Sequence, residues 1–235
     1  FREFERTSTA ACNAYIQPIV AHYLDSLINQ LRKEGYKHDL LIIQSNGGVV
    51  SSALAGKFPV NTLLSGPAGG VIAARHIGEA SGHNNVISCD MGGTSFDVSL
   101  IENGKPIYAN EIEVDFGVPL KVAQTDITTI GAGGGSIAWI DRAGMLQVGP
   151  HSAGADPGPA CYGKGGTEPT VSDANLILGR LNSILPYGAA GTFALDVELA
   201  KKAIKKIADP LGYDIYQAAL GIIRVCNTNM AGAIR

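Results

Sequence analysis

The sequence predicts a mixed α/β fold in which glycine-rich hairpins alternate with helices, and three observations support this. Short apolar runs end in glycine clusters at 40–48 and 86–93, a pattern typical of strands that meet turns. Apolar residues recur at helical spacing in 16–31 and 197–207. Glycine makes up 30 of the 235 residues, and hydrophobic residues make up 46% against 17% charged, a balance found in chains that bury a core.

The first third of the chain is expected to hold two long helices and a strand. Helical spacing predicts a helix from Thr7 to Gly35, with Pro18 as a kink or a restart. The apolar run 40–43 predicts a buried strand that ends in a turn. A second helix is expected from 65 to about 80, because Pro67 lies in a first turn that does not need its N–H.

The rest of the chain is expected to form hairpins followed by three helices. Strand patterns occur at 86–90, 96–101, 106–114, 136–140 and 145–148. Helical patterns occur at about 172–182, 196–208 and 214–235. Between these two groups, residues 149–170 are expected to form a long loop, and loops of that length in compact domains are usually functional or mobile.

A nine-residue motif across the first of these hairpins carries most of the chemistry. It reads Asp90-Met91-Gly92-Gly93-Thr94-Ser95-Phe96-Asp97-Val98. The two glycines let the backbone pass close to a ligand, and consecutive N–H groups in such a turn form an anion-binding concavity. Thr94 and Ser95 can add hydroxyl donors to phosphate oxygens, while Asp90 and Asp97 can hold a hydrated Mg²⁺, which prefers oxygen ligands. The alternative is an ordinary hairpin turn whose Asp97 faces solvent.

A second glycine cluster, Gly131–Gly135, has four glycines in five positions. Such a segment loses much conformational entropy when it becomes ordered. Two interpretations stay open. Either Gly133 and Gly134 allow the close approach of a substrate or a nucleotide phosphate, or the segment is a flexible hinge.

Three further patterns carry little functional weight. The segment 158–164 matches G-x-x-x-x-G-K, but Gly165 stands where a P-loop needs Ser or Thr to bind Mg²⁺. Cys161 can in principle act as a nucleophile, but the sequence pairs no base with it, so a buried or inert thiol is expected. His151 has no second His at ligand spacing and is expected to lie on the surface.

Composition excludes several classes of function. Eighteen basic residues stand against twenty-one acidic ones with no basic run, which argues against a nucleic-acid-binding protein. No apolar stretch reaches the roughly 18 residues of a membrane span. The four cysteines are scattered without a C-x-x-C pair, so reduced thiols and a cytoplasmic location are expected.

Taken together, these segments resemble the hydantoinase A/5-oxoprolinase family. The resemblance rests on the 90–98 motif and on the segments 1–9, 44–48, 65–70, 129–138, 149–163 and 167–175. That family is similar in turn to the actin, sugar-kinase and heat-shock ATPases, whose second phosphate motif reads D-x-G-G-[GT]-[ST]-x-D-V. The resemblance implies an incomplete ribonuclease-H-like or actin-like ATPase fold, with a mixed sheet and flanking helices.

The resemblance also implies roles for the site residues. Asp90 would be the catalytic residue, holding the Mg²⁺ shell or orienting water, and Asp97 would reach a metal-bound water. The turn 92–95 would hold β- and γ-phosphate oxygens of ATP. No second D-x-G-G-T occurs in this sequence, and the expected adenosine motif would start beyond its last residue. Residues 1–83 are therefore expected to end one ATPase lobe and 84–235 to begin the other, and the chain alone is expected to be inactive.

The implied activity is the ATP-dependent hydrolysis of a cyclic amide, a hydantoin or 5-oxoproline, through phosphorylation of the amide oxygen. A hydantoinase B-type subunit or domain is the implied partner. Two alternatives stay open: a subunit of an ATP-dependent ketone carboxylase, which would activate an enol, and a non-catalytic module that uses the ATPase scaffold for assembly or regulation.

Overall fold

The chain divides into two compact units, which are described separately. The computed structural model describes residues 1–115, 117–187 and 194–235. Unit 1 comprises Phe1–Ser88 and Ser99–Ile127, and unit 2 comprises Cys89–Val98 and Thr128–Arg235. The sequence prediction gave 99–127 to the second ATPase lobe, whereas this segment packs within unit 1. The assignment of either unit to an ATPase lobe stays a prediction.

Unit 1 is built around one long helix, α1 (Glu3–Lys33). The helix continues through Pro18 without a break, so no restart occurs there. It ends with a hydrogen bond from Tyr36 N–H to Leu31 C=O (2.9 Å), just after Gly35 takes a positive φ. Short elements pack along it, namely α2 (Ser52–Lys57) and η1 (Pro59–Thr62).

The predicted helix 65–80 is confirmed in unit 1. The predicted strand at 40–43 is also present, but it is not buried as expected, because Leu41 and Ile43 are exposed. Strand β1 (Leu41–Ile43) pairs antiparallel with β2 (Val49–Ser51). Helix α3 (Ser65–Ala80) has the predicted bounds. The turn between β1 and β2 lies against this helix, since a Cβ on Gly47 would lie 2.6 Å from the Ile72 side chain.

The predicted strand 106–114 is wrong, because this stretch forms three short strands with three different partners. They are β5 (Lys105–Pro106), β6 (Tyr108–Ala109) and β7 (Ile112–Asp115), paired respectively with β4 (Phe96–Glu102), β9 (Gln124–Thr125) and β8 (Val118–Leu120). Pro106 has no N–H to continue a ladder.

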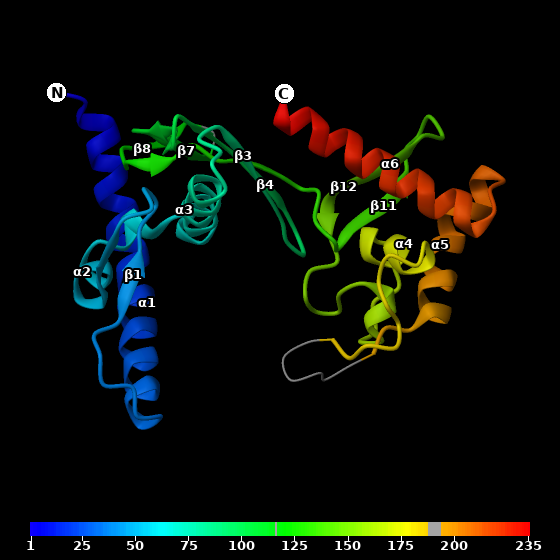
Figure 1. Cartoon of the computed structure of the whole chain (residues 1–235), viewed down its shortest axis with the longest axis horizontal. Coiled ribbons are helices and arrows are strands. Elements are labelled where there is room, and N and C mark those ends of the chain that lie inside the picture. The colour runs from blue at the N-terminus through cyan, green and yellow to red at the C-terminus, as the bar shows by residue number, and fades with distance from the viewer. Residues whose placement is uncertain (116, 188–193) are drawn as a thin grey trace. The chain divides into compact units, whose positions relative to one another are not determined.

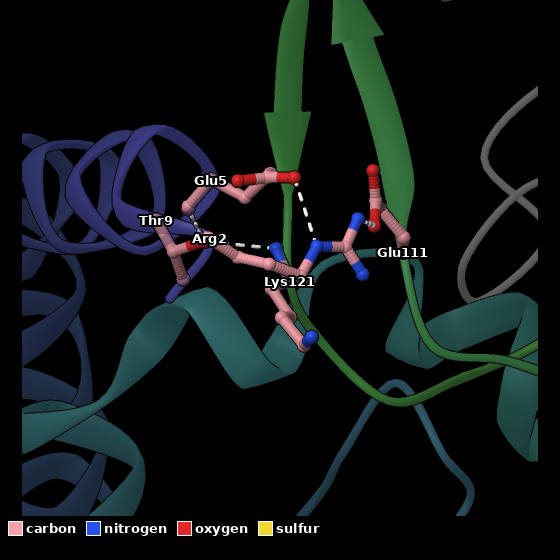
Figure 2. A network of polar contacts seen from close by, with 5 residues as sticks. All are labelled: Arg2, Glu5, Thr9, Glu111 and Lys121. Atoms are coloured by element: carbon pink, nitrogen blue, oxygen red, sulfur yellow. Dashed lines mark hydrogen bonds and ion pairs between the residues drawn. The ribbon is translucent and has the colours of Figure 1, made fainter.

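A polar network ties the start of α1 to β7 and β8 (Figure 2). Arg2 donates to the carboxylates of Glu5 (2.9 Å) and Glu111 (2.5 Å). Thr9 Oγ1 accepts from Lys121 N–H at 2.8 Å. These contacts are exposed, and exposed ion pairs contribute little to stability because solvent screens them.

In its described residues, unit 2 combines two hairpins with three α-helices, which can be followed in Figure 1. The sheet has the order β10 (Thr128–Ile130), β4, β3 (Val86–Met91), and the unit contains 89–98 and 128–130 of it. Strands β11 (Ser136–Ile140) and β12 (Leu146–Ser152) form the second predicted hairpin. The helices are α4 (Val171–Ile177), α5 (Val197–Leu211) and α6 (Ile215–Ile234).

The core of unit 2 explains why these elements meet. Apolar residues of β4 and β12 and of all three helices form one buried cluster, which includes Phe96, Val148, Ala174, Ile204 and Ile222. Helix α4 ends earlier than the sequence predicts, because Gly179 takes a positive φ and Arg180 N–H caps the end by donating to Asn175 C=O. Within the described ranges, none of the helices is both long and apolar enough to cross a membrane.

Candidate phosphate-binding turn

The turn between β3 and β4, Gly92–Ser95, is called the glycine turn here. It is closed by a hydrogen bond from Gly92 N–H to Ser95 C=O (2.9 Å). Within the described part of the chain, the N–H groups of Gly93, Thr94 and Ser95 and the hydroxyls of Thr94 and Ser95 have no hydrogen-bond partner. Gly92, Gly93 and Thr94 are exposed. Consecutive free N–H groups on an exposed turn are donors suited to an anion.

The outer side of the glycine turn has room for a group from outside the chain. A Cβ on Gly93 would have no heavy atom within 4 Å, and one on Gly92 would have only Ser95 O, at 3.8 Å. Neither glycine has a positive φ. The packing of the chain therefore does not require glycine at these two positions, whereas a ligand that approaches the backbone would require it.

The two predicted carboxylates lie on one face of the sheet. The hydrogen bond from Gly92 N–H to Ser95 C=O places these two residues opposite each other. Two residues further along each strand, Asp90 of β3 is therefore opposite Asp97 of β4, and the side chains of such a pair point to the same face. Asp97 is paired in turn with Thr129 of β10, whose hydroxyl donates to Asp97 Oδ1 at 2.5 Å. Asp90 is exposed and Asp97 is half-buried, so both carboxylates can be reached by solvent.

The predicted metal site has only these two carboxylates. No group of three or more His, Cys, Asp and Glu side chains that could hold a metal ion occurs in the described residues. An ion here would take its remaining ligands from water or phosphate, which fits Mg²⁺, since it usually keeps several waters and is bound by one or two carboxylates plus phosphates.

The Gly131–Gly135 segment, called the glycine run here, lies directly against the glycine turn. Gly134 N–H donates to Gly92 C=O (2.9 Å), and Gly135 N–H donates to Gly93 C=O (2.6 Å). A Cβ on Gly133 would lie 2.6 Å from Thr94 N, so this glycine permits close backbone contact. The run thus supports the turn. Direct contact of Gly133 and Gly134 with a nucleotide stays a prediction.

Cys161 is not placed or charged as a nucleophile. Its side chain is fully buried, and burial first, followed by the nearby carboxylate of Asp173, raises the pKa of the Cys161 thiol. A thiol held protonated is a poor nucleophile, in agreement with the inert role expected from the sequence. His151 is exposed, also as expected.

Two residues near the turn were not singled out from the sequence. Thr129 reaches Asp97 only through strand pairing, for which the sequence gives no local signal. Asp173 forms a capping box with Thr170 at the start of α4. A Thr followed three residues later by an acid, before an apolar helix, is a known helix-start pattern and could have revealed it.

Comparisons with known proteins point to one family. The family model described as "Hydantoinase/oxoprolinase" matches residues 6–235. The chain is 43% identical to caprolactamase subunit alpha of Pseudomonas jessenii, 41% to acetophenone carboxylase gamma subunit of Aromatoleum aromaticum and 38% to 5-oxoprolinase of Saccharomyces cerevisiae. These matches cover 98–100% of this chain.

The structural comparison agrees. The crystal structure of ATP-dependent caprolactamase from Pseudomonas jessenii superposes on the whole chain with a TM-score of 0.79 and 43% identity, and 34% of that chain is covered. The chain spans about a third of the length of the first two relatives, 33% and 32%, and 18% of the third.

Proposed function

The chain belongs to the hydantoinase/oxoprolinase family, and on that premise we propose that the whole protein uses ATP to hydrolyse the C–N bond of a cyclic amide. The observation that carries the proposal is the glycine turn, where three consecutive N–H groups and two hydroxyls have no partner among the described residues and lie beside two carboxylates. Similarity to an ATP-dependent caprolactamase and to 5-oxoprolinase supports it, because both names denote enzymes that act on cyclic amides. The fold that goes with this proposal is the actin-like ATPase fold.

In this proposal, the glycine turn binds the β- and γ-phosphates of ATP. The N–H groups of Gly93, Thr94 and Ser95 donate to phosphate oxygens, and the two hydroxyls add further donors. Fixed donors of this kind stabilise the charge that develops on a transferring phosphoryl group. Gly133 and Gly134 support the turn through contacts with its backbone, and in the proposed complex they also contact the nucleotide.

Asp90 and Asp97 would hold Mg²⁺ in this proposal. When bound, Mg²⁺ supplies positive charge to the phosphate oxygens. Asp90 would also orient the amide that receives the phosphoryl group, since its exposed carboxylate has no hydrogen-bond partner in the described residues and is available to the substrate. Asp97 is held in place by the Thr129 hydroxyl.

The reaction proposed is activation of the amide by phosphorylation. The amide oxygen forms a bond to the γ-phosphorus, the bond between the γ-phosphorus and the bridging oxygen breaks, and ADP leaves. Loss of the amide resonance then lets water add to the ring carbon, and the C–N bond breaks as the nitrogen takes a proton, which leaves an acyl phosphate. A second water adds to the carbonyl carbon of the acyl phosphate, the bond from that carbon to the phosphate oxygen breaks, and the carboxylate and phosphate are released. Phosphorylation thus makes a stable ring amide cleavable.

A second candidate function is the activation of an enol in a ketone carboxylase. The 41% identity to acetophenone carboxylase gamma subunit favours it, because the same phosphate site could serve either acceptor. The relatives named as subunits also support a proposed partner, a hydantoinase B-type subunit or domain. The division into ATPase lobes near residue 83 and the cytoplasmic location stay predictions.

Substrate-coupled ATP turnover by the whole protein with its partner tests the proposal. Hydantoin, 5-oxoproline and caprolactam are each compared with acetone or acetophenone plus bicarbonate. Stimulation by a cyclic amide, with ring-opened product equal to the ADP formed, supports hydrolysis. Stimulation only by the ketones with bicarbonate would favour the carboxylase instead, and Mg-ATP binding without stimulation by any of them would favour the non-catalytic module.

A further inference from the structure

One buried carboxylate in unit 2, that of Asp173, has no part in the proposed reaction. The residue is 0% exposed, and none of the ion pairs in the described residues involves it. Its Oδ2 accepts from the N–H and the hydroxyl of Thr170 (3.0 and 2.7 Å), and its Oδ1 accepts from Cys161 N–H (2.7 Å). A carboxyl group this deeply buried is tolerated when its oxygens accept hydrogen bonds from donors.

These hydrogen bonds join two segments of unit 2. Thr170 is the N-cap of α4, and Asp173 is the third residue of that helix. Cys161 lies in η2 (Ala160–Tyr162), inside the long loop that follows β12. Asp173 therefore holds part of this loop against the first turn of α4.

The first turn of α4 contacts the glycine run in turn. Ser172 N–H donates to Gly134 C=O at 2.7 Å, and Gly134 N–H donates to Gly92 C=O at 2.9 Å. A Cβ on Gly134 would lie 2.9 Å from Ser172 Oγ, so the two segments are in close contact. The start of α4, the glycine run and the glycine turn are thus linked by consecutive backbone hydrogen bonds.

We propose that Asp173 is a positioning residue for the glycine turn. Asp173 fixes the first turn of α4. The Ser172 N–H in that turn holds the carbonyl of Gly134, and the Gly134 N–H in turn holds the carbonyl of Gly92. The inference rests on the proposed function, since the position of the turn matters most if the turn binds phosphate. The proposal gives the long loop a role as well, because the hydrogen bond from Cys161 N–H to Asp173 lets the loop support the residue that positions the turn.

Asp173→Asn is the direct test, because it keeps the shape of the side chain but replaces one acceptor oxygen by an NH₂ group. Whichever way the amide is turned, that group faces N–H or hydroxyl donors. Asp214→Asn is the matched control. Asp214 also forms a capping box, at the start of α6, but it is exposed, and in the described residues its carboxylate accepts a hydrogen bond only from Gln217 N–H.

Amide hydrogen exchange in the whole protein, without any nucleotide, measures whether Asp173 affects the glycine run and the glycine turn. Asp173→Asn is expected to speed amide exchange at least tenfold in peptides that cover 89–98 and 131–136, while Asp214→Asn leaves both unchanged. Unchanged exchange in Asp173→Asn would overturn the inference. Faster exchange together with a wild-type protein that binds no ATP would support the positioning role and overturn the proposed function.

Nucleotide binding separates positioning from general destabilisation. Because the glycine turn is proposed to hold the β- and γ-phosphates, Asp173→Asn is expected to weaken binding of Mg-ATP at least tenfold and binding of AMP less than twofold. Equal losses for the two nucleotides would contradict the inference.

A second pair of variants decides the matter if Asp173→Asn does not fold. Gly134→Ala is expected to weaken Mg-ATP binding at least tenfold, because its Cβ meets Ser172 Oγ. Adding Ser172→Ala removes that oxygen and is expected to restore binding to within threefold of wild type, a non-additive result typical of residues in contact. A double variant as weak as Gly134→Ala alone would show that α4 does not set the position of the glycine run.

Discussion

Adding one methyl group to the glycine turn separates the binding of phosphate from the stability of the fold. A Cβ on Gly93 would lie in open space, and its backbone φ is not positive. Gly93→Ala should therefore leave the free energy of unfolding unchanged or raise it by about 0.4–1 kcal/mol, the usual gain when alanine restricts the unfolded chain. The same methyl group would stand where the phosphate is proposed to approach the backbone.

The expected loss in affinity follows from the hydrogen bonds that the methyl group displaces. A hydrogen bond to a charged group contributes about 1.5–3 kcal/mol, and about 1.4 kcal/mol corresponds to a tenfold change in affinity. Losing one such bond should weaken Mg-ATP binding by roughly 10- to 100-fold. Isothermal titration calorimetry of the whole protein measures the affinity, and urea unfolding measures the stability.

Gly133→Ala is the matched comparison for Gly93→Ala, because it adds the same methyl group at a buried glycine of the same unit. Its Cβ would lie 2.6 Å from Thr94 N and Thr94 C, which are backbone atoms and cannot rotate away. Overpacking of this kind costs about 1–3 kcal/mol, so this variant should lose stability and affinity together. A Gly93→Ala protein that binds Mg-ATP as tightly as wild type would refute the reasoning about the glycine turn.

Three further outcomes are expected. Asp90→Asn should reduce substrate-stimulated ATP turnover at least 100-fold at unchanged thermal stability, measured by coupled ADP release, and unchanged turnover would remove Asp90 from the mechanism. Cys161→Ala should keep at least half of the wild-type turnover, and the native thiol should resist iodoacetamide at pH 8, because burial raises its pKa. The hydrogen bond from Lys206 lowers the pKa of Glu168 from 4.5, so this pair should stabilise the protein above about pH 4.5 and cease to do so as acid protonates the carboxylate. Urea unfolding of wild type and Glu168→Gln between pH 3 and 7 should show a stability difference only toward neutral pH, and a difference that persists at pH 3 would contradict this assignment.

Local patterns in the sequence predicted the larger elements well. Helix α3 begins at the Ser-Gly-Pro step as expected, and β11 has the predicted range. Its hairpin partner β12 was predicted to end at 148 but continues to Ser152, so the long loop begins four residues later than expected. The helix and the hairpin both depend on residues that lie close together in the chain. The predicted fold class, mixed α/β, is confirmed because it follows from such local elements.

Elements that depend on distant partners were missed. Strands β6 and β9 have two residues each and exist because they pair with each other across an intervening segment. A two-residue strand has no periodicity, so a sequence pattern cannot indicate it. The prediction of one strand at 106–114 was wrong because the residues of this stretch belong to three short strands that pair with different partners.

The site shows the same division between local and distant signals. The glycine turn and its two carboxylates were found because they are contiguous in the chain. The support behind the turn was not found, since Gly134 meets Gly92 only when segments some forty residues apart are folded together. The number of glycines in the run is a local signal, but it does not distinguish contact with a ligand from packing against another backbone.

The most direct test of the central claim is a crystal structure of the whole protein with Mg²⁺ and a non-hydrolysable ATP analogue. Phosphate oxygens should lie within about 3.2 Å of the backbone nitrogens of at least two of Gly93, Thr94 and Ser95, the ordinary range of an N–H···O hydrogen bond. A nucleotide whose phosphates lie elsewhere, with these three nitrogens facing only solvent, would contradict the claim.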